Sequence, residues 1–379
     1  MQRKILPGTS VSLPRLGFGA MRLPVNEDES INYEKAAELF DYAIKNGVNY
    51  FDTAFGYHNG KSAEFVGKCL SNYERSSYFL ANKMPPWGVK EKEDLDKIFE
   101  KQLSDLKTDY IDFYLLHALG DDNYQKMIDL GAYDFCLEKK KKGIIHYMGF
   151  SFHGSLKALE ALISYGKSRN GWDFIQIQFN YLDYFSGNAK AEYDMITAAG
   201  IPVIVMEPVR GGKLADLPVR AKEVLEKAAP DVTPAEVALR WVAEFDNVVT
   251  ILSGMSNEDQ VKENIKTLSE CKPLDDALKT AVYDAANEIR RIKTIPCTAC
   301  NYCTEVCPAG IKIPYIFDRY NKYLDNKDMG AFKKDYEENC PEGTRASDCL
   351  ACGACVEKCP QKIAIPDILP LMPVIKKEQ

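Results

Sequence analysis

Residues 78–117, YFLANKMPPWGVKEKEDLDKIFEKQLSDLKTDYIDFYLLH, contain one complete strand–helix–strand unit. The short apolar runs at 78–83 and 109–117 are rich in aromatic and aliphatic residues and predict buried strands. Between them, apolar residues recur at i, i+3 and i+4 spacing, which predicts an amphipathic helix over 92–106. The apolar face of that helix consists of Leu95, Ile98, Phe99, Leu103 and Leu106.

The same unit repeats along the first 270 residues or so. Near-continuous apolar strands separated by helices are typical of parallel sheets that are covered on the outside. Eight such repeats predict an α/β fold, a closed (β/α)8 TIM barrel. An open, doubly wound sheet usually has a third glycine in its first turn, and GFGAM at 17–21 lacks it. The further strands are predicted at 16–19, 50–54, 145–151, 174–180, 202–208 and 248–254.

Composition narrows the class of protein. The 379 residues carry 48 Lys+Arg and 55 Asp+Glu, a formal net charge of −7, and no large basic patch, so we expect no nucleic-acid partner. We find no apolar run long enough to span a membrane. The first ten residues, MQRKILPGTS, lack the apolar core of a secretory signal. We therefore expect a cytoplasmic protein without a membrane partner.

Cysteine is distributed very unevenly, because nine of the 12 cysteines lie between Cys297 and Cys359. Two runs, CTACNYCTEVCP at 297–308 and CLACGACVEKCP at 349–360, repeat the spacing of bacterial ferredoxins. That spacing is far more specific than a zinc or disulfide pattern and predicts two [4Fe–4S] clusters. Because the fourth cysteine of each run reaches the other cluster, the predicted ligands are Cys297, Cys300, Cys303 and Cys359 for one cluster and Cys349, Cys352, Cys355 and Cys307 for the second. Cys340 has no ligand position in this scheme and is expected to be a spectator.

These patterns divide the chain into three parts. We expect the barrel over 1–272, a connecting helix over 273–293, and a two-cluster domain over 294–370. The segment between the two cysteine runs, 314–339, has few β-branched residues and is predicted to be helical. The last part is therefore expected to be a small, mainly helical, ferredoxin-like iron–sulfur domain.

Four polar residues stand at or just after the ends of successive predicted strands. They are Asp52, Tyr57, Lys83 and His117. The C-terminal ends of barrel strands face one common mouth, where active sites lie. A tyrosine titrates near 10, and a neighbouring ammonium group such as that of Lys83 lowers that pKa. Asp52 would keep Lys83 charged, Tyr57 would donate a proton, and a neutral His117 would hydrogen-bond a substrate carbonyl oxygen.

Eight short stretches carry a family resemblance. They are RLGFGAMRLP (15–24), FDTAFGYHNGKSAEFVGKCL (51–70), LANK (80–83), YIDFYLLH (110–117), GFSFHG (149–154), IQFNYLD (177–183), EPVRGG (207–212) and GMSNEDQVKEN (254–264). In these stretches the chain resembles the aldo/keto reductases, and in particular the subgroup with a C-terminal iron–sulfur extension. This resemblance implies reduction of an aldehyde or ketone by NAD(P)H, with Tyr57 as the proton donor and Asp52, Lys83 and His117 at the other catalytic positions.

The resemblance also implies a nucleotide site. Gln178 and Ser151 match the residues that hold the nicotinamide carboxamide, and Met206 falls where many relatives stack an aromatic ring. Gln260 stands where NADPH-preferring members often have an arginine for the 2′-phosphate, so NADH and NADPH both stay open. The remaining predicted nucleotide contacts are Gly19, Met21, Asp52, Gly211, Gly254, Ser256, Glu263 and Asn264.

One hydride carries two electrons, whereas each cluster accepts one. A flavin could divide the pair, but we recognise no flavin motif in the sequence. The alternative function is an electron-transfer protein that couples NAD(P)H, through a flavin or directly, to the clusters and a redox partner protein. A third hypothesis is a nucleotide-sensing regulatory subunit. The complete set of Asp52, Tyr57, Lys83 and His117 favours the reductase, because neither a scaffold nor a sensor needs it.

Overall fold

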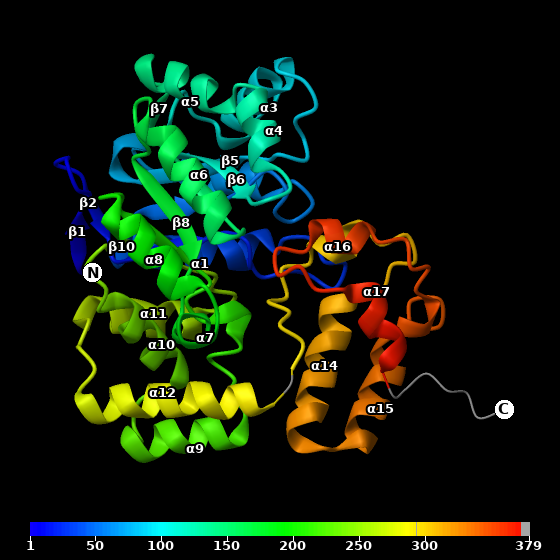
Figure 1. The fold of residues 1–379 in the computed structure, drawn as a ribbon. Coiled ribbons are helices and arrows are strands. Elements are labelled where there is room, and N and C mark those ends of the chain that lie inside the picture. Colours follow the sequence, from blue (N-terminus) through cyan, green and yellow to red (C-terminus); the bar gives the residue numbers. More distant parts are fainter. Residues whose placement is uncertain (293, 373–379) are drawn as a thin grey trace. The chain divides into compact units, whose positions relative to one another are not determined.

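The computed structural model describes residues 1–292 and 294–372 (Figure 1). The chain forms two compact units, which are described separately. The first comprises Met1–Val209 and Ala235–Asp276, and the second comprises Arg210–Pro234 and the chain from Ala277 onward. The second unit thus includes residues 210–234, a stretch that the sequence suggested as part of the barrel. Lys293, the last residue of the expected connecting helix, lies outside the described residues.

The first unit is built on a closed barrel of parallel strands in the order β10-β3-β4-β5-β6-β7-β8-β9. Each of the eight strands overlaps a run that the sequence predicts, with ends that differ by at most two residues, so the predicted fold class is confirmed. The strands are β3 (Leu16–Gly19), β4 (Tyr50–Asp52), β5 (Phe79–Met84), β6 (Ile111–Leu119), β7 (Ile145–Phe152), β8 (Phe174–Gln178), β9 (Val203–Met206) and β10 (Val248–Ser253).

The alternation of side chains between the two faces of each strand explains why the mouth of the barrel is polar. The interior is filled by one apolar cluster that includes Tyr50, Ala81, Phe113 and Phe174. Successive side chains of a strand point to opposite faces, so residues two apart share the interior side. The next interior positions toward the C-terminal ends are therefore polar on several strands. These positions are occupied by Asp52, Lys83, His117, Gln176 and Gln178.

A short hairpin of β1 (Arg3–Ile5) and β2 (Ser12–Pro14) precedes the barrel. Leu6 and Leu13 of this segment belong to the same apolar cluster as the barrel interior, so the hairpin contributes to that core. The sequence did not predict it, because three-residue strands are too short to show a period of two.

Helices cover the outside of the barrel (Figure 1). In α3, Leu95, Phe99 and Leu106 are buried, as the predicted apolar face requires. Gln102 of the same helix is also fully buried, because it donates to the carbonyl oxygen of Lys83 at 2.7 Å and accepts from Tyr114 Oη at 2.6 Å. The helices of this unit are α1 (Tyr33–Lys45), α2 (Ser62–Leu70), α3 (Glu93–Leu106), α4 (Tyr124–Asp129), α5 (Ala132–Lys141), α6 (Leu156–Lys167), α7 (Tyr181–Ser186), α8 (Ala189–Ala198), α10 (Pro234–Ala243) and α11 (Glu258–Glu270).

The second unit is mainly helical, as predicted. The helical segment predicted at 314–339 is two packed helices, α14 and α15 (Figure 1). Lys327 ends α14 with a left-handed φ of 59°, and the Asp328 side chain caps α15 by accepting from Ala331 N. None of the helices in the described residues is long and apolar enough to cross a membrane. The helices of this unit are α9 (Val219–Ala228), α12 (Asp276–Arg291), α13 (Tyr302–Glu305), α14 (Ile313–Asn326), α15 (Met329–Asn339), α16 (Ala354–Lys358) and α17 (Ile365–Ile368).

Candidate active site and cluster sites

Lys83 is the centre of the polar group at the barrel mouth. Its Nζ atom lies 2.6 Å from Asp52 Oδ1. It also donates hydrogen bonds to the Thr53 carbonyl oxygen at 2.8 Å and to Tyr57 Oη at 3.4 Å. One ammonium group therefore contacts both the aspartate and the tyrosine that the sequence singled out.

Tyr57 comes from the loop between β4 and α2, and the local sequence explains how this loop returns toward the barrel. His58, Asn59 and Gly60 have left-handed φ angles of 51°, 53° and 79°. Asn and Gly adopt this region most readily, so YHNG is a suitable sequence for the reversal. The N–H of Ser62, the first residue of α2, then donates to the Tyr57 carbonyl oxygen at 3.2 Å.

The ion pair of Lys83 and Asp52 is shielded from water. Lys83 is fully buried and Asp52 is 3% exposed. Burial raises the pKa of Asp52 and lowers the pKa of Lys83, while the attraction between the two groups opposes both shifts. At 2.6 Å the charged pair is favoured, and it places a positive charge beside the Tyr57 hydroxyl.

His117 completes the group that the sequence predicted. Its ring centroid lies 6.1 Å from that of Tyr57 and 5.0 Å from that of Trp87. Burial lowers the pKa of His117 well below its usual value, and the positive charge of Lys83 adds to this effect. The imidazole is therefore neutral at pH 7. Its Nδ1 atom has no hydrogen-bond partner among the described residues.

The residues expected to hold the nicotinamide lie on three neighbouring strands, β7, β8 and β9. Gln178 ends β8, Met206 ends β9, and the two are paired in the sheet. Gln178 Nε2 donates to Asp183 Oδ2 at 2.6 Å. Ser151 lies on β7, and its Oγ atom accepts from the Ala118 N–H at 2.7 Å. These contacts fix two of the three side chains before any ligand binds.

The residues expected at the adenosine end follow β10 on the chain. The Asn264 side chain donates to Ser253 Oγ at 3.0 Å. Ser256 Oγ donates to the Arg22 carbonyl oxygen at 2.8 Å, and the Gln260 side chain accepts from Ser256 N at 2.8 Å. Gly19 and Met21 lie at the end of β3 and just beyond it, Gly254 follows β10, and Glu263 lies on α11.

Gly211 differs from the other predicted nucleotide contacts, because it belongs to the second unit. Its φ is 67°, and a Cβ atom there would lie 2.3 Å from the carbonyl oxygen of Thr298. Thr298 stands between the first two cysteines of the first run, and Lys213 Nζ donates to the nearby Ile295 carbonyl oxygen at 2.7 Å. Packing against the first cysteine loop is thus one reason for glycine here, and a nucleotide contact stays a prediction.

Two contacts of the barrel mouth were not foreseen from the sequence. Arg22, in the loop after β3, forms a 3.0 Å ion pair with Glu207, the residue after β9. Asp183, near the start of α7, accepts the hydrogen bond from Gln178. Asn180-x-x-Asp183 was recognisable as a helix start, but its contact with a strand end required the tertiary structure.

Burial of a carboxyl group on α8 makes the stability of the folded protein depend on pH. Glu192 is largely buried, and burial, together with the negative charge of Asp183, raises the pKa of Glu192 to about 7. In the unfolded chain this pKa is near its ordinary 4.5. The folded protein therefore holds a proton that the unfolded chain has lost, and this stabilising contribution disappears as pH rises from 4.5 to 7. We expect Glu192→Gln to be more stable than the parent at pH 8 by up to about 3 kcal/mol.

The gain in stability of Glu192→Gln over the parent should shrink as the pH falls toward 5.5. Anaerobic urea unfolding, followed by near-ultraviolet circular dichroism, measures this difference. Glu160→Gln, at an exposed position of α6, is the matched control and should show no such trend. A Glu192→Gln variant whose gain does not change with pH would contradict the assignment.

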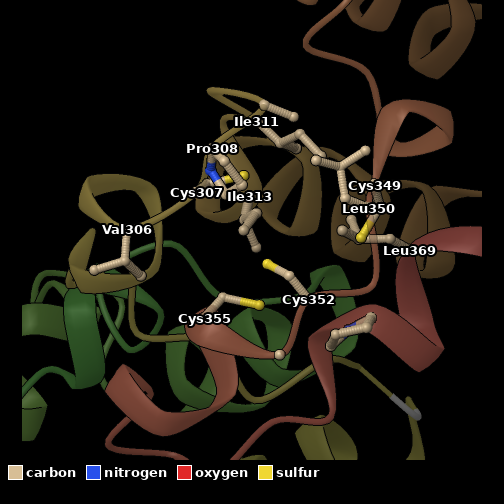
Figure 2. Close-up of a pocket in the computed structure, with 13 residues that line it drawn as sticks. Val306, Cys307, Pro308, Ile311, Ile313, Cys349, Leu350, Cys352, Cys355 and Leu369 are labelled. Carbon is tan, nitrogen blue, oxygen red and sulfur yellow. The ribbon is translucent and has the colours of Figure 1, made fainter.

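The second unit contains two cavities lined by cysteines. Figure 2 shows one of them, with the sulfur atoms of Cys352 and Cys355 pointing toward its middle. Cys349 of the same run lines this cavity, together with Cys307, the last cysteine of the first run. The walls are otherwise apolar, with Val306, Ile311, Ile313, Leu350 and Leu369 among them.

The other cavity has the reciprocal composition. Cys297, Cys300 and Cys303 of the first run line it with Cys359, the last cysteine of the second run. Ile313 lines both cavities, so the two sites are neighbours. Cys340 lines neither and is fully buried in the core of the unit. The grouping of the cysteines is the one that their spacing predicted.

The residues present fit the groups that these sites suggest. Four thiols around an apolar cavity are the donor set of an iron–sulfur cluster. At the barrel mouth, Asp52 Oδ2, His117 Nδ1 and Gln176 Oε1 are buried without a partner among the described residues. Buried polar atoms of this kind are costly unless a ligand or water satisfies them. The mouth is therefore suited to a polar ligand.

Comparison with known proteins identifies the class. Residues 15–282 match the model of the aldo/keto reductase family, and residues 296–364 match that of the 4Fe-4S dicluster domain. The first match covers more than half of the chain, which therefore belongs to the aldo/keto reductase family. The predicted resemblance is confirmed, and the protein is an NAD(P)H-dependent oxidoreductase of the aldo/keto reductase type with a C-terminal 4Fe-4S domain.

Similar proteins cover about two thirds to three quarters of the chain. The uncharacterized oxidoreductase YqkF of Bacillus subtilis is 27% identical over 324 residues, 75% of this chain and 99% of that protein. Methylglyoxal reductase YeaE of Escherichia coli is 28% identical over 273 residues, 66% of this chain and 84% of that protein. The holo form of aldo-keto reductase AKR11C1 from Bacillus halodurans has a TM-score of 0.63 and 28% identity, covering 75% of this chain and 96% of that one.

Proposed function

We propose that this protein reduces an aldehyde or ketone with a nicotinamide nucleotide, with Tyr57 as the proton donor, and that it carries two [4Fe–4S] clusters. The observation that carries the proposal is the buried ammonium group of Lys83 in contact with both Asp52 and Tyr57 Oη. We assign residues 1–272 to the reductase domain, 273–293 to a connecting helix and 294–370 to the cluster domain.

The side chains divide the work of proton transfer. When bound, the nicotinamide nucleotide supplies a hydride to the carbonyl carbon. Tyr57 Oη donates the proton that the carbonyl oxygen needs to become a hydroxyl. Lys83 stabilises the phenolate left behind, and Asp52 keeps Lys83 charged and in place. A neutral His117 hydrogen-bonds the same carbonyl oxygen and orients it toward Tyr57.

Gln178, Ser151 and Met206 would hold the nicotinamide, since they lie at or next to the ends of neighbouring strands at the mouth. Gly19, Met21, Gly254, Ser256, Gln260, Glu263 and Asn264 would contact the rest of the nucleotide. Gln260 uses its side-chain oxygen on Ser256 N and offers no positive charge for a 2′-phosphate, so NADH and NADPH both remain candidates. The names of two similar proteins, methylglyoxal reductase YeaE of Escherichia coli and the glyoxal reductase of Bacillus subtilis, suggest small dicarbonyl compounds as the first substrates to test.

A second candidate function is electron transfer between the nucleotide and a redox partner protein. The observation that favours it is the shared wall at Ile313, which makes the two cysteine sites neighbours. Each cluster, when bound, would carry one electron. Cys297, Cys300, Cys303 and Cys359 would hold one cluster, and Cys307, Cys349, Cys352 and Cys355 the other.

An anaerobic assay distinguishes the two candidates. Protein with reconstituted clusters is mixed with NADH or NADPH, first alone and then with methylglyoxal. We expect nucleotide oxidation only after the carbonyl is added, with one alcohol formed per nucleotide oxidised. Bleaching of the iron–sulfur absorption by nucleotide alone, with no carbonyl turnover, would refute the reductase and support electron transfer.

A further inference from the structure

The contact between Gln178 and Asp183 determines which way the Gln178 amide is turned. Gln178 Nε2 donates to Asp183 Oδ2 at 2.6 Å. An ionised carboxylate has acceptors but no donor. The amide can satisfy Asp183 only with its NH2 group, so its oxygen is directed away from Asp183.

Asp183 is itself held in place by Asn180, which is fully buried. The Asp183 N–H donates to Asn180 Oδ1 at 2.9 Å, and Asn180 Nδ2 donates to Asp183 Oδ2 at 2.8 Å. Asn180 Nδ2 also donates to the Glu207 carbonyl oxygen at 3.1 Å, which ties the start of α7 to the residue after β9. The carboxylate therefore cannot swing away without breaking several part-buried hydrogen bonds.

We propose that Asp183 is a positioning residue that fixes the polarity of the Gln178 amide, so that the site recognises the NH2 group of the nicotinamide carboxamide. With Nε2 engaged by Asp183, Gln178 presents its Oε1 acceptor to the ligand. A carboxamide NH2 is the matching donor. This inference rests on the proposed function, because it assumes that Gln178 contacts the nicotinamide.

The polarity can be tested with a ligand that lacks the donor. In the 3-acetylpyridine analogue of the nucleotide, a methyl group replaces the carboxamide NH2 and the carbonyl group is retained. The full chain should bind the natural nucleotide about tenfold more tightly than this analogue, the worth of one hydrogen bond. Dissociation constants are measured by nucleotide fluorescence, with NADH or NADPH and the analogue of matching phosphorylation.

Asp183→Leu removes the acceptor and keeps a side chain of similar size. With no acceptor at this position, the Gln178 amide can turn over and offer its NH2 group to the ligand. The preference for the natural nucleotide should therefore fall to about twofold or less. Loss of structure alone would weaken both ligands together and leave their ratio unchanged.

Three further variants complete the test. Asp183→Glu keeps the acceptor and should retain the preference, whereas Asp183→Ala removes the acceptor and should reduce the preference as Asp183→Leu does, even if the leucine variant fails to fold. Asp173→Ala is the matched control at the other end of β8, where the carboxylate pairs with Lys140 and accepts from Met148 N. Its preference should equal that of the parent.

The outcomes separate the inference from the function on which it rests. If the parent protein binds the natural nucleotide preferentially and Asp183→Leu and Asp183→Ala keep that preference, the positioning role is refuted and the proposed function stands. If the parent protein binds no nicotinamide nucleotide, the proposed function fails and this inference fails with it.

Discussion

Replacement of Tyr57 by phenylalanine is expected to lower carbonyl reduction by about 10²–10⁴-fold, the usual contribution of a positioned proton donor. The phenylalanine ring keeps the shape of the side chain but has no proton to donate. It also removes the 3.4 Å contact with Lys83 Nζ, which retains Asp52 and the Thr53 carbonyl oxygen as partners. The measurement is kcat for methylglyoxal with saturating nucleotide, together with the dissociation constant of the nucleotide.

The nucleotide dissociation constant and the iron–sulfur absorption should stay unchanged in this variant, since Tyr57 lies in the barrel unit and the cysteine sites in the other. Tyr50→Phe is the matched control. Tyr50 is a fully buried tyrosine of β4, and its hydroxyl has no hydrogen-bond partner among the described residues. Removal of that hydroxyl should leave kcat within about twofold of the parent value, because an unmade hydrogen bond contributes nothing that the variant could lose. Turnover by Tyr57→Phe at the parent rate would refute the proton-donor role.

The barrel and the polar residues at its mouth could be predicted because a few short-range rules determine them. Each strand is an apolar run long enough to be recognised, and chain order alone places its C-terminal end at the mouth. Asp52, Lys83 and His117 therefore needed no knowledge of side-chain contacts to be singled out. The cysteine runs were predictable for a similar reason, since the spacing of four thiols within eleven residues restricts what they can bind.

The features that escaped prediction depend on contacts between distant segments. Gln102 lies in an apolar stripe and was not assigned to the core, although it is buried against the Lys83 carbonyl oxygen and Tyr114. The bond from Gln178 to Asp183 depends on how α7 turns back after β8. Gly211 was predicted to contact the nucleotide, and its tight packing against Thr298 involves residues 87 positions apart. Local periodicity carries no information about such pairs.

The assignment of the cysteines to the two clusters predicts which double cysteine variants keep an intact cluster and which lose both. Cys297→Ala/Cys359→Ala should retain one complete [4Fe–4S] cluster, about four irons per chain, with the spectrum of an unperturbed site. Both altered residues line the same cavity, so the other cavity keeps all four of its thiols. Cys297→Ala/Cys307→Ala removes one thiol from each cavity and should leave no cluster with four cysteine ligands. Iron and sulfide analysis, with electron paramagnetic resonance of the dithionite-reduced protein, measures both.

The opposite pattern would mean that each run holds its own cluster. In that case Cys297→Ala/Cys307→Ala would keep the intact cluster and Cys297→Ala/Cys359→Ala would keep none. Cys307→Ala/Cys349→Ala is the reciprocal variant and should retain the cluster of the other cavity, which guards against a general loss of folding. Cys340→Ala is the matched control, because Cys340 lies in the core and lines neither cavity, and it should retain both clusters. The two double variants thus distinguish crossed from separate ligation by which one keeps an intact cluster, even if the total iron content falls in both.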